Sequence, residues 1–114
     1  MSTYIGRSAE DAAAGFLHQK GFEILSQNWR TRWCEIDIVA QKDNVIHFVE
    51  VKFRSSPAAG SGLDYITPSK IKQLKRAALF WTNENNWEDD YQIDVIAVDG
   101  PSGKITYLEN AIMG

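Results

Sequence analysis

Residues 45–53, Val-Ile-His-Phe-Val-Glu-Val-Lys-Phe, constrain the fold of this chain more than any other segment. Their β-branched and aromatic side chains are typical of a strand. A second strand-like run covers residues 34–41, and only the polar residues 42–44 separate the two runs. A connection this short predicts an antiparallel hairpin. The rest of the chain must therefore pack on a β-sheet.

Two segments have the apolar spacing of helices. Residues 8–20 contain Ser8 and Asp11 in the pattern of a capping box, which predicts Ser8 as the N-cap. Residues 68–83 begin with a proline directly after Thr67, which predicts Thr67 as the cap of the second helix. Each helix has one apolar stripe, so each is expected to cover one face of the sheet.

Three further segments, 22–28, 91–98 and 104–108, have the composition of strands. The predicted order is helix, three strands, helix, two strands, in a single α/β domain covering residues 1–114. The helix of residues 68–83 would cross over and bring the fourth strand parallel to the third. We expect a mixed five-stranded sheet flanked by two main helices.

Charge is distributed unevenly along the chain, whose net charge is −3. Residues 50–80 carry six basic and two acidic side chains, whereas residues 81–114 carry one basic and seven acidic. The middle segment is suited to meet phosphates, and the tail repels them. The sequence has no run of about 20 apolar residues and no signal-peptide pattern, and the single cysteine, Cys34, cannot form an internal disulfide. We therefore expect a cytoplasmic protein without a membrane partner.

Charged residues interrupt the two strands of the hairpin. Asp37 lies in the first strand, and Glu50 and Lys52 lie two positions apart in the second, so that these two project from one face. Charges in such strands are costly to bury unless they are paired or bound to a metal. The tight turn allows the two carboxylates to lie side by side, where a divalent cation would relieve their repulsion.

Phosphodiester hydrolysis accounts for this set of residues. Mg²⁺ or Mn²⁺ takes hard oxygen ligands, which Asp37, Glu50 and the carbonyl of Val51 would supply. Lys52 would orient or deprotonate the attacking water and balance charge, and Glu10 would hold a second ion or a metal-bound water. Two alternatives remain open. Glu50 and Lys52 also suit a simple salt bridge, and Glu10 also suits the first turn of a helix, where the dipole favours an acid.

Four basic residues are candidates for nucleic-acid contacts: Arg54, Lys70, Arg30 and Arg32. Arg54 opens a segment rich in Ser, Pro and Gly, residues 54–62, which predicts a mobile loop. Trp29 and Trp33 bracket the basic pair Arg30 and Arg32, so they are the best candidates for stacking on unpaired bases.

Several other polar or aromatic residues have structural interpretations. Glu35 is expected to pair with an arginine, although a metal-ligand role stays open, and Asp94 is expected to pair with a basic side chain. Trp81 should belong to the core. His47 should be structural or exposed, and Cys34 should be a small, partly buried filler.

The residues also resemble a known signature. Asp37, with twelve residues before Glu50-Val51-Lys52, resembles the PD-(D/E)xK nuclease motif, and the whole chain resembles the YraN-type family of small bacterial proteins. The segments that carry the family resemblance are Gly6 with Glu10 and Ala13, 21–25 with Asn28, 35–40, 48–54, 67–70, Ala77 or Ala78, 93–97, and Asn110 with Ala111. Two departures are Cys34, where the family usually has glycine, and Gln92, where it tends to have arginine.

The resemblance implies a restriction-endonuclease-like core similar to that of archaeal Holliday-junction resolvases. Asp37, Glu50 and Lys52 would be the catalytic set, with Glu10 in support. We therefore expect an Mg²⁺- or Mn²⁺-dependent endonuclease acting on structured or branched DNA rather than RNA, and a homodimer by analogy with the resolvases. One alternative is a nucleic-acid-binding module without significant catalysis. The other is a protein-interaction domain whose charges are structural.

Overall fold

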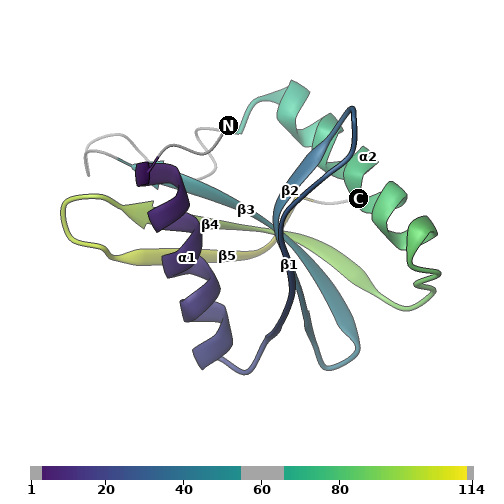
Figure 1. Cartoon of the computed structure of the whole chain (residues 1–114), viewed down its shortest axis with the longest axis horizontal. Helices are drawn as coiled ribbons and strands as arrows, with labels where there is room; N and C mark the ends of the chain where they lie inside the picture. Colours follow the sequence, from purple (N-terminus) through teal and green to yellow (C-terminus); the bar gives the residue numbers. More distant parts are fainter. Residues whose placement is uncertain (1–3, 55–65, 113–114) are drawn as a thin grey trace.

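The computed structural model describes residues 4–54 and 66–112, with side chains from Arg7 onward (Figure 1). Its elements are α1 (Tyr4–Gln19), β1 (Glu23–Arg30), β2 (Glu35–Lys42), β3 (Val45–Arg54), α2 (Pro68–Glu84), β4 (Tyr91–Asp99) and β5 (Ile105–Ile112). The predicted order of helix, three strands, helix and two strands is confirmed. Most of the predicted loop of residues 54–62 lies outside the described residues.

The five strands form one mixed sheet in the order β1-β2-β3-β4-β5. Neighbouring strands are antiparallel except β3 and β4, which are parallel and are joined through α2, as predicted. The hairpin between β2 and β3 closes at Lys42 opposite Val45. Its two turn residues, Asp43 and Asn44, both have positive φ, at 52° and 64°. Positive φ at both positions is the signature of a type I′ turn, whose twist matches that of the strands.

The two helices cover opposite faces of the sheet (Figure 1). Neighbouring residues of β3 show this division, because Phe48 packs on the α2 side and Val49 on the α1 side. Small and aliphatic side chains make the inner face of α1: Ala9, Ala13, Ala14 and Leu17. The inner face of α2 consists of Leu74, Ala77, Ala78 and Trp81, which confirms Trp81 as a core residue. Within the described ranges, no helix is long and apolar enough to span a bilayer.

Helix α1 begins at Tyr4, earlier than predicted, so the prediction of Ser8 as its N-cap is wrong. Nothing in residues 4–7 forbids a helix, since they contain no proline, and the helix continues through the capping-box pattern. Glu10 consequently lies in the second turn, and the dipole of the first turn explains its presence less well. The predicted cap of α2 is confirmed, because the Thr67 hydroxyl accepts a hydrogen bond from the amide of Lys70 at 3.1 Å.

Strand β5 extends to Ile112, further than the predicted end at residue 108. Its register against β4 shifts between Ile93 and Val95, and Asn110 adopts a φ of 49°. Three residues of β5, 109–111, therefore lie against the single residue Asp94 of β4, so the strand takes up two extra residues without ending. It brings Ile112 opposite Ile93, where both side chains are buried.

Candidate active site

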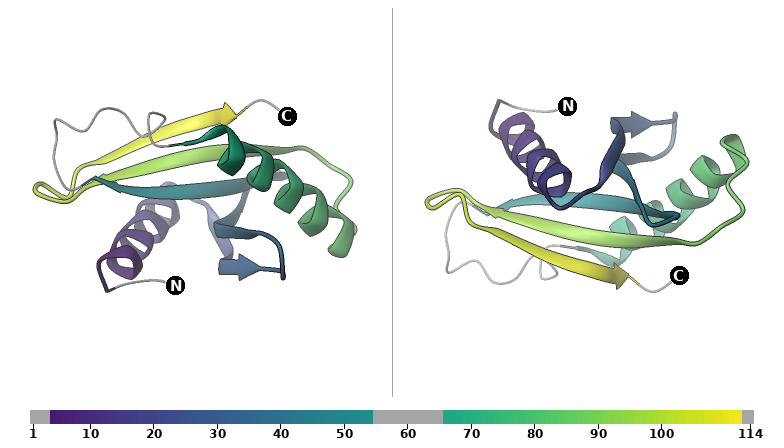
Figure 2. Two further views of the ribbon diagram at one scale, coloured as in Figure 1. Left: turned by 90° about the horizontal axis from the view of Figure 1, so that it is seen from above. Right: turned by 90° about the horizontal axis from the view of Figure 1, so that it is seen from below.

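The candidate site lies where β2 separates from β3. The ladder between the two strands runs from the turn to Ile38 opposite Val49 and ends there. In the same register, the next pair would be Asp37 opposite Glu50. Instead, Asp37 Oδ2 accepts a hydrogen bond from the amide of Val51 at 2.8 Å. Figure 2 shows the β1–β2 pair turning out of the plane that β3, β4 and β5 share. The Asp37 side chain thus takes the place of the next backbone hydrogen bonds between β2 and β3.

Glu50 is the most buried acid of this site, with 3% of its surface exposed. Its Oε2 lies 3.3 Å from Lys52 Nζ and 3.6 Å from Lys70 Nζ. Its Oε1 is also buried and has no hydrogen-bond partner among the described residues. Lys52 therefore lies beside Glu50 as the strand spacing predicts. Lys70, expected to meet substrate phosphate, comes from the first turn of α2 and also contacts the acid.

Asp37 and Glu50 influence each other electrostatically. Burial is the largest cause that raises the pKa of Asp37, and the charge of Glu50 is the second, so that this pKa reaches about 7. The amide of Val51 and the ammonium of Lys70 act in the opposite direction. The two carboxylates thus lie near each other, as the sequence predicts. Near neutral pH, the repulsion between the two carboxylates is relieved either by a proton on the pair or by a cation beside it.

Glu10 reaches this region from α1. Burial raises its pKa first, and the charge of Asp37 raises it further, whereas a hydrogen bond from the Asn28 side chain lowers it. Glu10 Oε1 is buried without a partner in the described part of the chain. Asn28 lies in β1 with a φ of 55°, a conformation that asparagine tolerates better than most residues. The sequence analysis did not predict this supporting role for Asn28, whose one signal was its place in the family pattern.

The donor set fits a hard divalent cation better than a closed metal cage. Within residues 4–54 and 66–112, no three His, Cys, Asp or Glu side chains come close enough together to hold an ion. Structural zinc needs such a set, whereas Mg²⁺ commonly uses one or two carboxylates and completes its shell with water and substrate. Asp37 and Glu50 provide two carboxylates, and the unpartnered Oε1 of Glu50 is a vacant acceptor. The ligand roles of Glu10 and of the Val51 carbonyl stay predictions.

Three of the four predicted nucleic-acid contacts surround one groove of about 330 Å³ between the β1–β2 turn and α2. They are Arg30, Arg32 and Lys70. Arg30 also lies 3.8 Å from Glu35, which confirms the expected arginine partner of that acid. The fourth, Arg54, ends β3, where its carbonyl accepts a hydrogen bond from the amide of Gly100 at 2.6 Å. Arg54 is thus two residues from Lys52 but does not line the groove.

The four tryptophans differ in their exposure. Trp33 is 66% exposed beside the groove. Trp29, the other stacking candidate, packs partly against the α2-side core, as does Trp87. Cys34 is buried, as predicted. Of the two stacking candidates, Trp33 is thus exposed and Trp29 is partly buried.

A second buried carboxylate, that of Asp94 on β4, lies opposite Val49 and therefore on the α1 side of the sheet, one position along from Glu50. Asp94 accepts hydrogen bonds from Tyr107 Oη at 2.6 Å, Gln92 Nε2 at 2.8 Å and the amide of Asn110 at 2.8 Å, and it lies 2.6 Å from His47 Nδ1. Burial alone would raise the pKa of Asp94, but the hydrogen bonds outweigh it and lower that pKa. The predicted pairing of Asp94 with a basic side chain, and the structural role of His47, are confirmed. Gln92, which stands where the family tends to have arginine, donates directly to Asp94.

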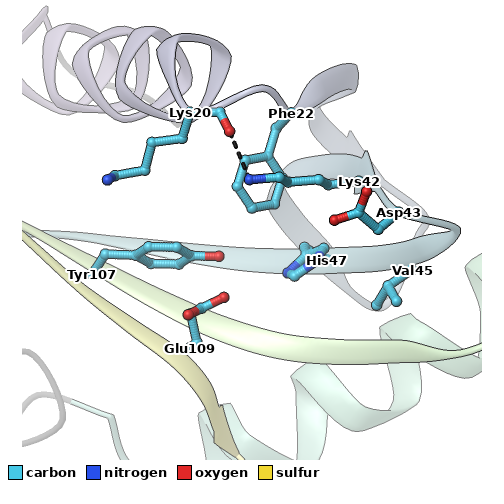
Figure 3. A pocket seen from close by; sticks show the side chains of 8 residues that line it. All are labelled: Lys20, Phe22, Lys42, Asp43, Val45, His47, Tyr107 and Glu109. Carbon is cyan, nitrogen blue, oxygen red and sulfur yellow. Dashed lines mark hydrogen bonds between the residues drawn. The ribbon is translucent and has the colours of Figure 1, made fainter.

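His47 and Tyr107 also line a pocket of about 370 Å³ at the hairpin end of the sheet (Figure 3). Phe22 lies between them, with its ring edge-on to both. Lys42 closes one side, and its ammonium donates to the carbonyl of Lys20 at 2.7 Å. Three of the polar side chains that line this pocket already have partners within the protein: His47 and Tyr107 contact Asp94, and Lys42 contacts the carbonyl of Lys20.

The fold and the site define an α/β protein with a buried acid, Glu50, a partly buried acid, Asp37, and two lysines where a hairpin separates from its sheet. The family described as "Uncharacterised protein family UPF0102" matches residues 9–98. A UPF0102 protein of Sulfurihydrogenibium sp. is 43% identical over 110 residues, covering 96% of this chain and 94% of the relative. A second, from Flavobacterium psychrophilum, is 39% identical over 109 residues, with coverages of 94% and 92%. A third, from Helicobacter hepaticus, is 41% identical over 109 residues, with coverages of 96% and 94%.

The chain belongs to the UPF0102 family. This assignment confirms the YraN-type resemblance noted from the sequence.

Proposed function

We propose that this protein is a divalent-metal-dependent endonuclease of the PD-(D/E)xK type that hydrolyses phosphodiesters in structured or branched DNA. One observation carries the proposal. Asp37 and Glu50 lie side by side where the β2–β3 ladder stops, and a buried Glu50 oxygen has no partner in the described structure. A protein that keeps two acids in this state pays a cost in stability, which a bound cation would offset.

Asp37 and Glu50 would bind the ion, and the carbonyl of Val51 would add a third oxygen. A bound Mg²⁺ or Mn²⁺ would polarise the phosphoryl group and make a bound water more acidic. Glu10, which is close enough to Asp37 to feel its charge, would hold a water of this shell through its unpartnered oxygen. Lys52 Nζ lies 3.3 Å from Glu50 Oε2, so its ammonium would orient the attacking water beside the acids. Only in its neutral amine form would Lys52 take the proton of that water.

Positive side chains around the acids would position the phosphates. Lys70 lies 3.6 Å from Glu50 and is one-quarter exposed, so it can contact both the site and a phosphate. Arg54 extends the basic surface along β3 beyond Lys52, and Arg30 and Arg32 extend it toward the β1–β2 turn. Such contacts hold the substrate in register without reading its sequence.

A nucleic-acid-binding module without significant catalysis is the alternative, and one observation favours it. Glu50 already has two ammonium partners, Lys52 and Lys70. These two positive charges balance the two acids without a metal ion. Under this alternative, the same surface would bind DNA and leave it intact.

Cleavage assays on five substrates test the proposal: single-stranded, duplex, flap and four-way-junction DNA, and RNA. Each is incubated with the protein and Mg²⁺ or Mn²⁺. We expect cleavage of the flap or junction, and Asp37→Asn and Lys52→Ala should each reduce its rate by about 10²- to 10³-fold. Asp89→Asn and Lys75→Ala are matched controls, because both residues are exposed and lie outside the site.

Cleavage that persists in both Asp37→Asn and Lys52→Ala would exclude this site. Binding to every substrate without cleavage under either metal would favour the binding module. A homodimer is a further part of the proposal, because a four-way junction presents two strands for symmetric cleavage. Sedimentation of the protein with and without a junction should show the mass of two chains, and a single chain in both samples would refute it.

A further inference from the structure

The groove between the β1–β2 turn and α2 leads directly to the candidate active site. Lys70 belongs to both, since it lines the groove and its Nζ lies 3.6 Å from Glu50 Oε2. Gln73, one turn further along α2, lines the same groove. Its Nε2 is buried without a partner among the described residues and is thus a vacant donor. A ligand in the groove would therefore touch a lysine of the active site.

The turn that presents Trp33 is held in place on both sides. Thr31 Oγ1 accepts hydrogen bonds from the amides of Trp33 at 3.1 Å and Cys34 at 3.2 Å, and the Thr31 amide donates to the Cys34 carbonyl at 2.8 Å. Directly after the turn, the amide of Glu35 donates to Gln73 Oε1 and ties β2 to α2. The turn is thus anchored to the helix, whereas the indole of Trp33 is 66% exposed.

An indole exposed to this extent can stack on a flat ring of a ligand. Tryptophan is among the most useful residues for stacking and is usually covered by other side chains. The guanidinium of Arg32 lies 5.7 Å from the Trp33 ring centre and leaves most of the ring open. Nucleobases stack on such rings whatever their sequence.

The charge of the groove favours a phosphate next to that base. Three cations line it, Arg30, Arg32 and Lys70, against one acid, Glu35, although the whole chain has a net charge of −3. The pair of Arg30 and Glu35, at 3.8 Å, has both side chains about half exposed. Such surface pairs contribute little stability. Arg30 can therefore exchange its carboxylate partner for a phosphate at low cost.

We propose that this groove binds an unpaired DNA nucleotide adjacent to the phosphate at the active site. The base stacks on Trp33, and Arg30 and Lys70 contact the flanking phosphates. A volume of about 330 Å³ lies within the range of small-ligand sites, which suits one nucleotide. The adjacency to a reacting phosphate rests on the proposed nuclease function, whereas the binding itself does not. A base inside a duplex is already stacked on its neighbours, so the groove selects single-stranded segments such as those of flaps and open junctions.

Binding without metal tests the groove separately from catalysis. The full chain carrying Asp37→Asn is titrated, in EDTA, into a fluorescein-labelled dT oligonucleotide and, separately, into a blunt duplex. Trp33→Ala in this background should weaken binding to dT by about 5- to 150-fold, as expected for one lost base stack. Trp33→Phe should restore most of the affinity because it keeps an aromatic face. Phe80→Ala is the matched control, since Phe80 is an exposed ring on α2 about ten residues beyond Lys70, roughly 15 Å along the helix.

Equal dT affinity with and without the Trp33 ring would overturn the proposal. So would an equal loss for dT and duplex, because that result indicates a general phosphate contact. Tighter binding of a U oligonucleotide than of dT would overturn the assignment to DNA. Binding to dT through Trp33 in a wild-type protein that never cleaves DNA would support the groove and refute the nuclease. DNA cleavage at the same rate in Trp33→Ala and in the wild type would support the nuclease and refute the groove.

Discussion

Asp94 and the pair of Asp37 and Glu50 lie close together in the sheet but differ in the partners of their carboxylates. Asp94 on β4 is opposite Val49, the residue that precedes Glu50 on β3. Asp94 is fully buried and has four partners, three of which are hydrogen-bond donors from a side chain or the backbone and the fourth a histidine. Its pKa is lowered. Asp37 has one backbone donor, and its pKa is raised to about 7. Glu50 keeps one buried oxygen without a partner in the described structure.

The contrast separates an acid whose partners the protein supplies from two acids that the protein leaves partly unpaired. The protein supplies everything that the carboxylate of Asp94 needs, so no ligand is required to explain it. At the Asp37–Glu50 pair, the protein leaves charge and hydrogen-bonding capacity uncompensated. Sites of this kind persist at a cost in stability when the missing partner comes from outside.

The largest expected effect is on stability at Asp94. Asp94→Ala removes the common acceptor of His47, Tyr107 and the amide of Asn110, which then stay buried without it. We expect a loss of about 3–5 kcal/mol in the free energy of unfolding, measured by urea denaturation. Asp89→Ala, which removes an exposed acid nearby in the sequence, should change it by less than about 0.5 kcal/mol. A loss below about 1 kcal/mol at Asp94 would remove the contrast between the two regions.

Divalent cations should stabilise the protein through the other region. At pH 8 and a concentration of Mn²⁺ 100-fold above its dissociation constant, we expect a gain of about 2.7 kcal/mol in thermal or urea unfolding. At pH 5 the gain should largely disappear, because Asp37 with a pKa of about 7 is then protonated. Glu50→Gln should abolish the gain at both pH values. An equal gain in Glu50→Gln and the parent protein would place the ion elsewhere.

Removal of the charge at Asp37 should stabilise the metal-free protein. Because the pKa of Asp37 is raised on folding, the folded state holds this proton more tightly than the unfolded state. Its contribution to stability is therefore full below the ordinary carboxyl pKa and is lost as the pH rises through about 7. Asp37→Asn keeps an oxygen for the amide of Val51 and should raise the free energy of unfolding by about 1–3 kcal/mol at pH 8. At pH 5 the gain should be smaller than at pH 8, because only part of the Asp37 contribution is lost there, and destabilisation at pH 8 would contradict this account.

The smallest expected effect concerns the support of Glu10. Asn28→Gly keeps the positive φ of this residue but removes its hydrogen bond to Glu10. Because that bond lowers the pKa of Glu10, its loss should raise this pKa further, as measured by NMR titration of the Glu10 carboxyl carbon. Asn28→Ala should raise it equally and also destabilise the fold by about 1 kcal/mol through backbone strain. An unchanged Glu10 titration in both variants would separate Glu10 from Asn28.

The sequence predicted the fold and the centre of the site because both depend on regular spacing. Period and turn chemistry predicted all seven elements, and the short turn predicted at residues 42–44 indicated that Asp37 and Glu50 can lie side by side. The same rules misplaced two element boundaries, the start of α1 and the end of β5. The capping pattern at Ser8 lies inside α1, since the preceding turn is also helical. Strand β5 continues past Glu109 because a bulge with Asn110 in a left-handed conformation takes up two extra residues.

Contacts between single polar side chains of distant elements were not predictable. The pairs of Glu10 with Asn28 and of Glu35 with Gln73 join different elements, and no periodic pattern records them. Lys70 was predicted as a phosphate contact, but its position beside Glu50 depends on how α2 docks on the sheet. The same holds for the separation of Trp29 from Trp33, because two neighbouring indoles with similar local sequence have different burial.

The length of the turn at Asp43 and Asn44 determines which residues of β2 and β3 lie opposite each other. Side chains alternate along both strands, so one residue more or fewer in this turn would shift the pairing and place an isoleucine, Ile36 or Ile38, opposite Glu50. A longer hairpin preserves the two acids only if it gains residues in equal numbers on each strand. Insertions that lengthen both strands equally should therefore keep Asp37 opposite Glu50, whereas an insertion that lengthens one strand alone should shift the pairing.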